Sequence, residues 1–188
     1  RRGDCALRVW PSVPPVFRLR LSKNMTSILK LRGAPALSSS RQERLSRAVG
    51  EVLPKLAGLA AEHWYFVEVS APLDAEETAR LVDLLDAHPA SAALPAGTLR
   101  LVVPRLGTIS PWSSKATDIA HQCGFDKIVR IERGVAYTID GRGVAGNAAL
   151  SALLHDRMTE AVLDTLDAAE ALFHHYQPQP LTTVNVIT

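Results

Sequence analysis

The alternation of short apolar runs with amphipathic segments is the feature that most constrains the fold of this chain. The runs are rich in β-branched and aromatic residues and end at turn residues, whereas the segments between them repeat apolar residues every three or four positions. The runs are therefore predicted strands and the segments predicted helices. Strands are expected at residues 27–33, 63–73, 98–105 and 127–140, and helices after the serines at 38–40, over 74–88 and over 114–123.

The order of these elements, β-α-β-α-β-α-β with short connections, predicts an α+β fold. We expect a two-layer sandwich in which a mostly antiparallel sheet carries its helices on one face. No Gly-x-Gly-x-x-Gly follows a strand, so a Rossmann fold is not favoured. Two details stay open. Pro54 should kink or shorten the first helix, and Gly134 should mark a hairpin or a bend in the last strand.

The composition is that of a chain that can bury a core. It has 188 residues, of which 47% are hydrophobic, and this suggests one domain or one domain plus part of another. No apolar stretch approaches the roughly 20 residues that a membrane span needs. The two cysteines, Cys5 and Cys123, are too few for a disulfide framework and form no Cys-x-x-Cys pair. We expect a cytoplasmic protein with no membrane partner.

Charge is distributed unevenly along the chain. Residues 1–24 hold six basic side chains against Asp4 alone, while the rest holds 15 basic and 18 acidic ones. An acidic body argues against a nucleic-acid partner, which would need a basic surface. The basic leader, residues 1–24, has three interpretations: a transit peptide, a disordered arm, or a non-native extension with Met25 as the true start. We favour the last, because the leader's prolines would break the helix of a transit peptide.

The C-terminal part is predicted to be helical after the glycine-rich turn at residues 141–146. Helices are expected over 148–155 and from Met158 to about His175. This tail has much apolar surface and little to cover it, so it resembles the start of a second unit and predicts poor solubility. The expected division is a leader at 1–24, an N-terminal domain at 25–143 and the start of a helical linker domain at 144–188.

One stretch, VPRLGTISPWSSKATDIAHQCG at residues 103–124, gathers polar and ionisable side chains at a strand-loop-helix junction. Anions bind at such junctions, because free amide groups and the helix dipole point into the loop. A Walker phosphate loop is nevertheless excluded. It would need Gly at position 112 and Lys at position 113, where this chain has Trp and Ser.

Catalytic chemistry within this stretch is also not supported. A Ser-x-x-Lys nucleophile would need Ser at position 112, and the pairing of two serines with a lysine places that lysine far upstream, unlike Lys115. His121 and Cys123 lie about 200° apart around a helix and cannot share a metal ion. Cys123 is expected to be a small buried hydrophobe. It belongs to a predicted apolar stripe with Ala116, Ile119 and Ala120. No catalytic or metal-binding residue is predicted.

The same stretch, followed by VRIERGVAYTI, closely resembles the N-terminal domain of the large single-chain phosphoribosylformylglycinamidine synthases, also called formylglycinamide ribonucleotide amidotransferases. LRGAPALS at residues 31–38 is similar to that family's opening motif. LLHDRMTEAVL at residues 153–163, with AEALFHHYQP after it, resembles the start of its linker domain. The resemblance covers residues 25–188, and Leu106 stands where the family more often has Pro.

The resemblance implies an ATP-dependent ligase of purine biosynthesis. The whole enzyme converts formylglycinamide ribonucleotide, ATP and glutamine to formylglycinamidine ribonucleotide, ADP, phosphate and glutamate, and a glutaminase domain releases the ammonia. The resemblance further implies that ATP and Mg²⁺ bind outside this segment, which holds no cofactor of its own. The synthetase and glutaminase domains would follow Thr188 and be its partners, so the segment should be inactive alone.

The resemblance also implies a role for the motif. In this family the N-terminal domain is similar to a dimer of a small separate subunit, and it packs on the synthetase domain near the active-site mouth and the ammonia route. We therefore expect a pseudo-repeat of strand-helix units and an interdomain or substrate-entrance surface. That surface comprises Arg105, Thr108, Ser110, Trp112, Ser113, Ser114, Lys115, Asp118 and His121. Two alternatives stay open. These side chains could hold the loop rigid, or the chain could be a free-standing regulatory module that binds a small anion at residues 113–115.

Overall fold

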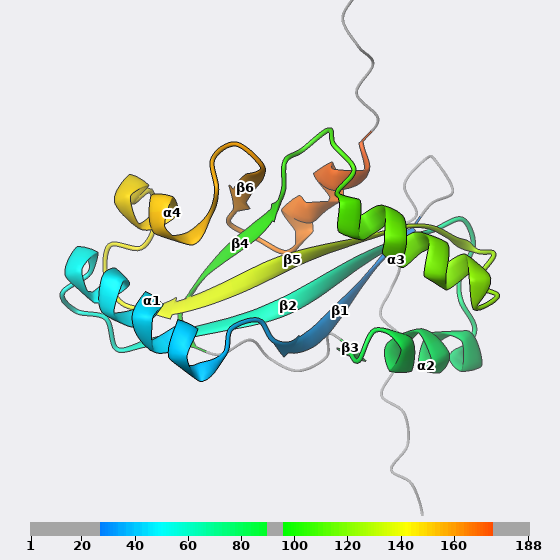
Figure 1. The fold of residues 1–188 in the computed structure, drawn as a ribbon, viewed down its shortest axis with the longest axis horizontal. Coiled ribbons are helices and arrows are strands. Elements are labelled where there is room, and N and C mark those ends of the chain that lie inside the picture. The colour runs from blue at the N-terminus through cyan, green and yellow to red at the C-terminus, as the bar shows by residue number, and fades with distance from the viewer. Residues whose placement is uncertain (1–26, 90–95, 175–188) are drawn as a thin grey trace, which may run out of the picture.

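A six-stranded antiparallel sheet organises the molecule in the computed structural model, which describes residues 27–89 and 96–174 (Figure 1). Neighbouring strands follow the order β3-β1-β2-β5-β4-β6, and the long strands β2 and β5 form its centre. The elements in chain order are β1 (Ser27–Pro35), α1 (Ser39–Val52), β2 (Gly58–Val69), α2 (Ala75–Leu84), β3 (His88–Pro89), β4 (Thr98–Pro104), α3 (Pro111–Gln122), β5 (Ile128–Asp140), α4 (Ala148–Leu154), β6 (Glu160–Leu163) and the 3-10 helix η1 (Asp167–Phe173).

The predicted two-layer arrangement is confirmed, because α1 to α4 pack on one face of the sheet. Figure 1 shows these helices in two pairs. α1 and α4 cover one end of that face, where Val49 and Leu150 join one buried cluster. α2 and α3 cover the other end, where Leu81 and Ala120 join a second cluster. Alternate residues of β2 and β5 supply the sheet side of both clusters, as the two-residue period of a strand requires.

The opposite face of the sheet is covered by the C-terminal segment, and this corrects one prediction. The helix expected from Met158 onward is wrong over the described residues, because β6 pairs with β4 and η1 follows it. Leu172 and Phe173 of η1 are buried with Trp64 and Phe66 of β2. The apolar tail is therefore covered, and the reason to expect poor solubility no longer holds. The sheet has a second apolar face, which the tail fills.

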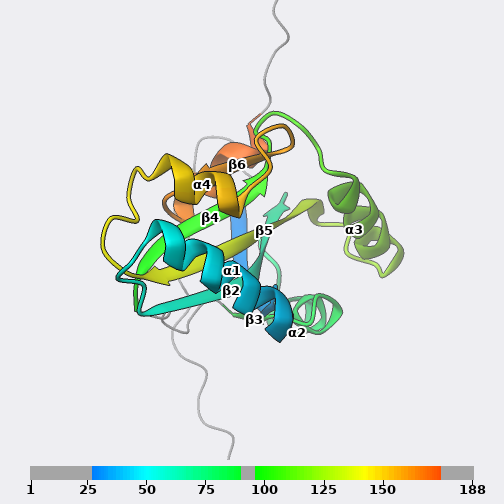
Figure 2. The same cartoon turned by 60° about the vertical axis from the view of Figure 1, so that its left-hand side comes forward.

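The sheet is symmetric about its centre. β1-α1-β2-α2-β3 and β4-α3-β5-α4-β6 are two copies of one unit, and a half-turn about the cross-strand pair of Trp64 and Gly134 exchanges them. β1 pairs with the C-terminal half of β2 as β4 pairs with the C-terminal half of β5. In the turned view of Figure 2, α3 again lies away from α1 and α4. The pseudo-repeat is thus present, but its unit holds three strands and two helices instead of one strand and one helix.

Local chemistry sets most element boundaries. Asp74 and Glu77 form a capping box at the start of α2, in which each side chain accepts a hydrogen bond from the other's backbone amide. α1 ends before Pro54, so this proline shortens the helix. β5 passes through Gly134 as one continuous strand. Glycine is needed there for its size, since a Cβ atom would lie 2.9 Å from the carbonyl oxygen of Val102.

Some predictions fall outside the described residues. These are the leader at 1–24 and the end of the C-terminal helix near His175. The division between domains at residue 143 stays a prediction, although β6 joins residues on both sides of it into one sheet. Within 27–89 and 96–174, no helix is both long enough and apolar enough to span a membrane.

Candidate functional site

The loop 105–110 and α3 place the polar motif along an open edge of β5. β4 pairs with only the C-terminal half of β5, so the N-terminal half lacks a strand on that side. α3 takes this position. Thr117 Oγ1 accepts a hydrogen bond of 3.0 Å from the Ile131 amide, and His121 Nε2 lies 2.7 Å from the Ile128 carbonyl oxygen. Two side chains one helical turn apart thus satisfy backbone groups of the strand edge, and His121 has this structural role.

A buried carboxylate, Glu132, holds the loop against the strand. Its side chain is fully buried and forms an ion pair with Arg130, which lies on the same face of β5. Ser110 Oγ donates to Glu132 Oε2 at 3.0 Å. As the N-cap of α3, Ser110 Oγ also accepts from the Ser113 amide at 3.0 Å. Ser110 therefore couples the first turn of α3 to the buried ion pair.

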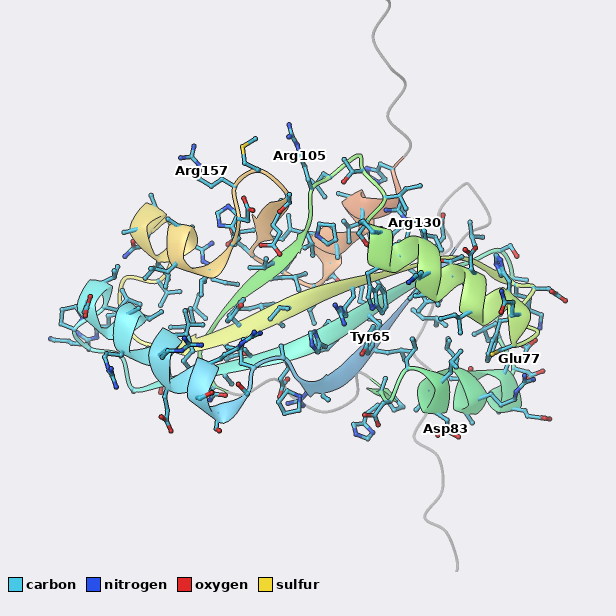
Figure 3. The ribbon with its side chains drawn as sticks, viewed as in Figure 1. Tyr65, Glu77, Asp83, Arg105, Arg130 and Arg157 are labelled. Carbon is cyan, nitrogen blue, oxygen red and sulfur yellow. The ribbon has the colours of Figure 1, made fainter. Side chains whose placement is uncertain are left out.

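Arg130 extends this network to the C-terminal segment (Figure 3). Its guanidinium donates to the carbonyl of Thr108 at 2.9 Å and to that of Leu172 at 3.1 Å, and it lies 5.4 Å from the centre of the Phe173 ring. One cation thus joins the loop, β5 and η1. Sequence reasoning missed both Arg130 and Glu132. The alternation in VRIER, which puts the two charged side chains on one face of a strand, is the pattern that could have identified them.

Trp112 lies on the helical face of the sheet. Its ring stacks with that of Tyr65 at 5.8 Å between ring centres, and the Arg133 guanidinium lies 4.7 Å from the centre of the Trp112 ring. Burial raises the pKa of Tyr65. Burial, and after it the charge of Arg133, lowers the pKa of His63. Trp112 therefore anchors α3 on the sheet by ring stacking and by contact with a cation.

Six of the motif residues are exposed, and they are the part of the predicted surface that a partner can reach. Figure 3 shows the Arg105 side chain pointing away from the body of the protein. Within the described residues, neither Lys115 nor Asp118 forms an ion pair. The exposed set is Arg105, Thr108, Ser114, Lys115, Asp118 and His121, of which His121 also contacts the strand edge through Nε2.

The buried face of α3 differs from the prediction. Cys123 is exposed as the C-cap of the helix, so the expectation of a buried cysteine is wrong. The chain turns at Gly124, whose φ is +84°, and Phe125 takes the buried position instead. Ile119 is 49% exposed, although its neighbour Ala120 is fully buried. The helix is therefore rotated away from the predicted apolar stripe, because it docks on the edge of β5 through polar as well as apolar side chains.

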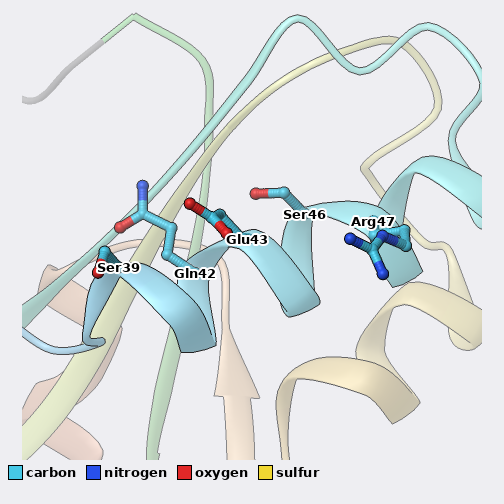
Figure 4. A pocket seen from close by; sticks show the side chains of 5 residues that line it. All are labelled: Ser39, Gln42, Glu43, Ser46 and Arg47. Atoms are coloured by element: carbon cyan, nitrogen blue, oxygen red, sulfur yellow. The ribbon is translucent and has the colours of Figure 1, made fainter.

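A cavity of about 460 Å³ lies between residues 107–109, α3 and η1. Ser113 lines it and is fully buried, and Ser113 Oγ has no hydrogen-bond partner among the described residues. Asp118 lines the same cavity from α3, and Phe173 lines it from η1. A second hollow lies elsewhere, on α1 (Figure 4). It is lined by Ser39, Gln42, Glu43, Ser46 and Arg47, none of which belongs to the motif.

The motif contains polar groups that can form hydrogen bonds and ion pairs. It presents an exposed ammonium group at Lys115, an exposed carboxylate at Asp118 and a buried hydroxyl at Ser113. Within residues 27–89 and 96–174, no three His, Cys, Asp or Glu side chains lie together in a group that could hold a metal ion.

The sequence also matches a known protein family. Residues 62–173, more than half of the chain, match the family model described as formylglycinamide ribonucleotide amidotransferase N-terminal. The chain belongs to this family. The resemblance in the sequence is confirmed, and the chain is part of a formylglycinamide ribonucleotide amidotransferase, an enzyme of purine biosynthesis. The amidotransferase match includes the motif and continues through β6 and η1, so the segment that covers the second face of the sheet falls within the family region.

Proposed function

We propose that this chain is a packing domain at the N-terminal side of the amidotransferase and is inactive alone. The whole enzyme would convert formylglycinamide ribonucleotide, ATP and glutamine to formylglycinamidine ribonucleotide, ADP, phosphate and glutamate. ATP and Mg²⁺ would bind in the synthetase domain, and a glutaminase domain would release the ammonia. Family membership supports the enzyme, and the surface around α3 supports the packing role.

Exposed aliphatic side chains around α3 are the main observation that supports the packing role. Ile109 is 63% exposed, Ile119 49% and Val129 45%, although large aliphatic residues are usually buried. Together with the six exposed motif residues they form what we call the α3 surface. Exposed apolar side chains among polar ones are typical of a protein contact. We infer that the synthetase domain covers the α3 surface, near the mouth of its active site and the ammonia route.

A free-standing module that binds a small anion at residues 113–115 is less well supported. Ser113 is buried at the cavity, whereas Lys115 is exposed and does not line it, so the two groups do not converge on one ligand. The backbone amide of Ser113 is already bound by Ser110. Asp118 lines the cavity, and its carboxylate repels an anion.

Association with the other domains tests the proposal. The 188-residue chain and the synthetase and glutaminase domains of a formylglycinamide ribonucleotide amidotransferase would be purified separately and mixed, and their affinity measured by calorimetry. We expect binding. Ile119→Asp should weaken it about tenfold, because a charge placed in an apolar contact loses its hydration.

Leu153→Asp is the matched control for this experiment. Leu153 is 41% exposed on α4, which lies far from α3 in Figure 1. The control should bind as the unaltered chain does. Failure of the chain to bind, equal affinities of the two variants, or formation of formylglycinamidine ribonucleotide by the chain alone would each contradict the proposal.

A further inference from the structure

We propose that the cavity beside α3 is a socket for one basic side chain of the domain that packs there. This inference rests on the proposed function, because it takes the synthetase domain as the partner. The occupant would be a lysine or arginine whose apolar stem enters between α3 and η1 and whose charged end reaches Asp118 and Ser113.

A buried hydroxyl without a partner is the first observation. Ser113 is fully buried, and its Oγ has no hydrogen bond among the described residues. Leaving such a group unpaired is destabilising, because the group loses its hydrogen bonds to water on burial. The neighbouring hydroxyl of Thr117, by contrast, already accepts from the Ile131 amide. Ser113 Oγ is therefore a buried hydroxyl at the cavity whose hydrogen-bonding capacity is unused among the described residues.

The charges at the cavity select a cation. Arg130 donates to Glu132 and to the carbonyls of Thr108 and Leu172, so its charge is balanced inside the protein. Asp118 lines the cavity, and no basic side chain of residues 27–89 and 96–174 pairs with it. Glu68 contributes a second carboxylate to the lining from β2. An approaching cation gains the attraction of the Asp118 carboxylate, whereas an anion is repelled by it.

The walls of the cavity suit the stem of a basic side chain. Ile109, Val129 and Phe173 line it with apolar atoms. Lysine and arginine bury their methylene groups against such surfaces while the charged end stays among polar groups. Ile109 and Val129 also belong to the α3 surface, so the cavity is continuous with the proposed protein contact. A side chain carried by a protein partner therefore fits the geometry.

The mixing experiment tests the socket with two conservative variants. Asp118→Asn removes the charge and keeps the shape, so it should weaken association about fivefold. Ser113→Ala removes the hydroxyl and should weaken association about threefold. Asp83→Asn is the matched control, because Asp83 is an exposed acid on α2 (Figure 3). It should bind as the unaltered chain does.

The outcomes of this experiment distinguish the socket from the proposed packing function. Weaker binding of Asp118→Asn and Ser113→Ala, with an unchanged Asp83→Asn, supports the socket. If the unaltered chain binds its partner and Asp118→Asn binds equally well, the socket is wrong and the proposed function stands. If the unaltered chain does not bind, the proposed function fails, and the socket is then decided by a small probe.

That probe is n-butylguanidinium, a cation on an apolar stem. It would be titrated into the isotopically labelled chain and followed by amide resonances, with n-butyl phosphate as its anionic counterpart. Shifts concentrated at Ser113, Asp118 and Val129, with the guanidinium alone, support the socket. No shift there with the guanidinium, or equal shifts with the phosphate, overturns it.

Discussion

The two β-α-β-α-β halves share one topology but hold their first helices differently. Ser38, the N-cap of α1, makes no side-chain capping bond, whereas Ser110 caps α3 and also donates to Glu132. Glu62 on β2 and Glu132 on β5 occupy equivalent positions of the two halves. Both carboxylates pair with an arginine, yet the second is fully buried and the first is not. In the second half the fully buried Glu132 thus also anchors a loop, through Ser110.

The second helices of the two halves, α2 and α4, are capped in the same way. Asp74 caps α2 by accepting from the Glu77 amide, and Asn147 caps α4 by accepting from the Leu150 amide. These caps are equivalent because both helices need their first amide groups bound. The N-caps of α2 and α4 are therefore alike in the two halves. The N-caps of α1 and α3 differ, because Ser110 also binds Glu132 beside the candidate site.

Glu132→Gln should have the largest effect on stability. It leaves Arg130 without its buried counter-charge, and breaking a buried pair costs about 3–5 kcal/mol. Glu62→Gln should cost less, because the side chains of Arg32 and Glu62 keep 20% and 19% of their surface exposed. Urea unfolding of the two variants gives both losses. Equal losses would mean that burial does not distinguish the two halves.

Gly134→Ala should cause the second-largest loss of stability. It alters the cross-strand pair of Trp64 and Gly134, which lies on the symmetry axis. A Cβ atom there would meet the carbonyl oxygen of Val102 at 2.9 Å and Cγ1 of Val103 at 3.0 Å. Overpacking of this kind costs about 1–3 kcal/mol. Gly50→Ala in α1 is the control, because no atom lies within 4 Å of its added Cβ, and it should stabilise slightly. Thermal melts compare the two, and a Gly134→Ala protein as stable as the Gly50→Ala protein would refute the argument.

Ser110→Ala should cost about 1–2 kcal/mol, because it removes both the cap of α3 and a hydrogen bond to Glu132. Ser38→Ala should cost less than about 0.5 kcal/mol, since Ser38 makes no capping bond. Chemical denaturation measures the difference between these two N-caps. A larger loss for Ser38→Ala would reverse the comparison.

The smallest expected effect on stability is a pH dependence caused by His63. The equivalent position of the second half is Arg133. Burial and the charge of Arg133 lower the pKa of His63 in the folded protein below the ordinary value of 6.5. The unfolded chain therefore binds the proton first. Stability should fall as the pH drops through 6.5 toward the folded pKa and then level off. His63→Gln should flatten this dependence below about pH 7, as urea unfolding at each pH can check; an unchanged slope would contradict it.

Most of the fold could be predicted from local patterns, and the exceptions have one cause. α2 and β4 were predictable because a cap or a strand period acts within a few residues. β6 was not, since four residues of the sequence EAVL become a strand only when the edge of β4 is available to them. Cys123 was misplaced for a similar reason. Its exposure depends on how α3 docks on β5, which the sequence of the helix alone does not specify.

The sequence by itself determined the family, the order of strands and helices from β1 to α4 except the two-residue β3, and the loop and helix that carry the candidate site. These follow from motifs and caps whose interactions are local. Only the tertiary structure decided that Glu132 is buried, that His121 serves a strand edge, and that residues 160–173 cover the second face of the sheet. Such outcomes depend on burial shared between elements far apart in the chain, because the free energy of a contact depends on every surface that excludes water from it.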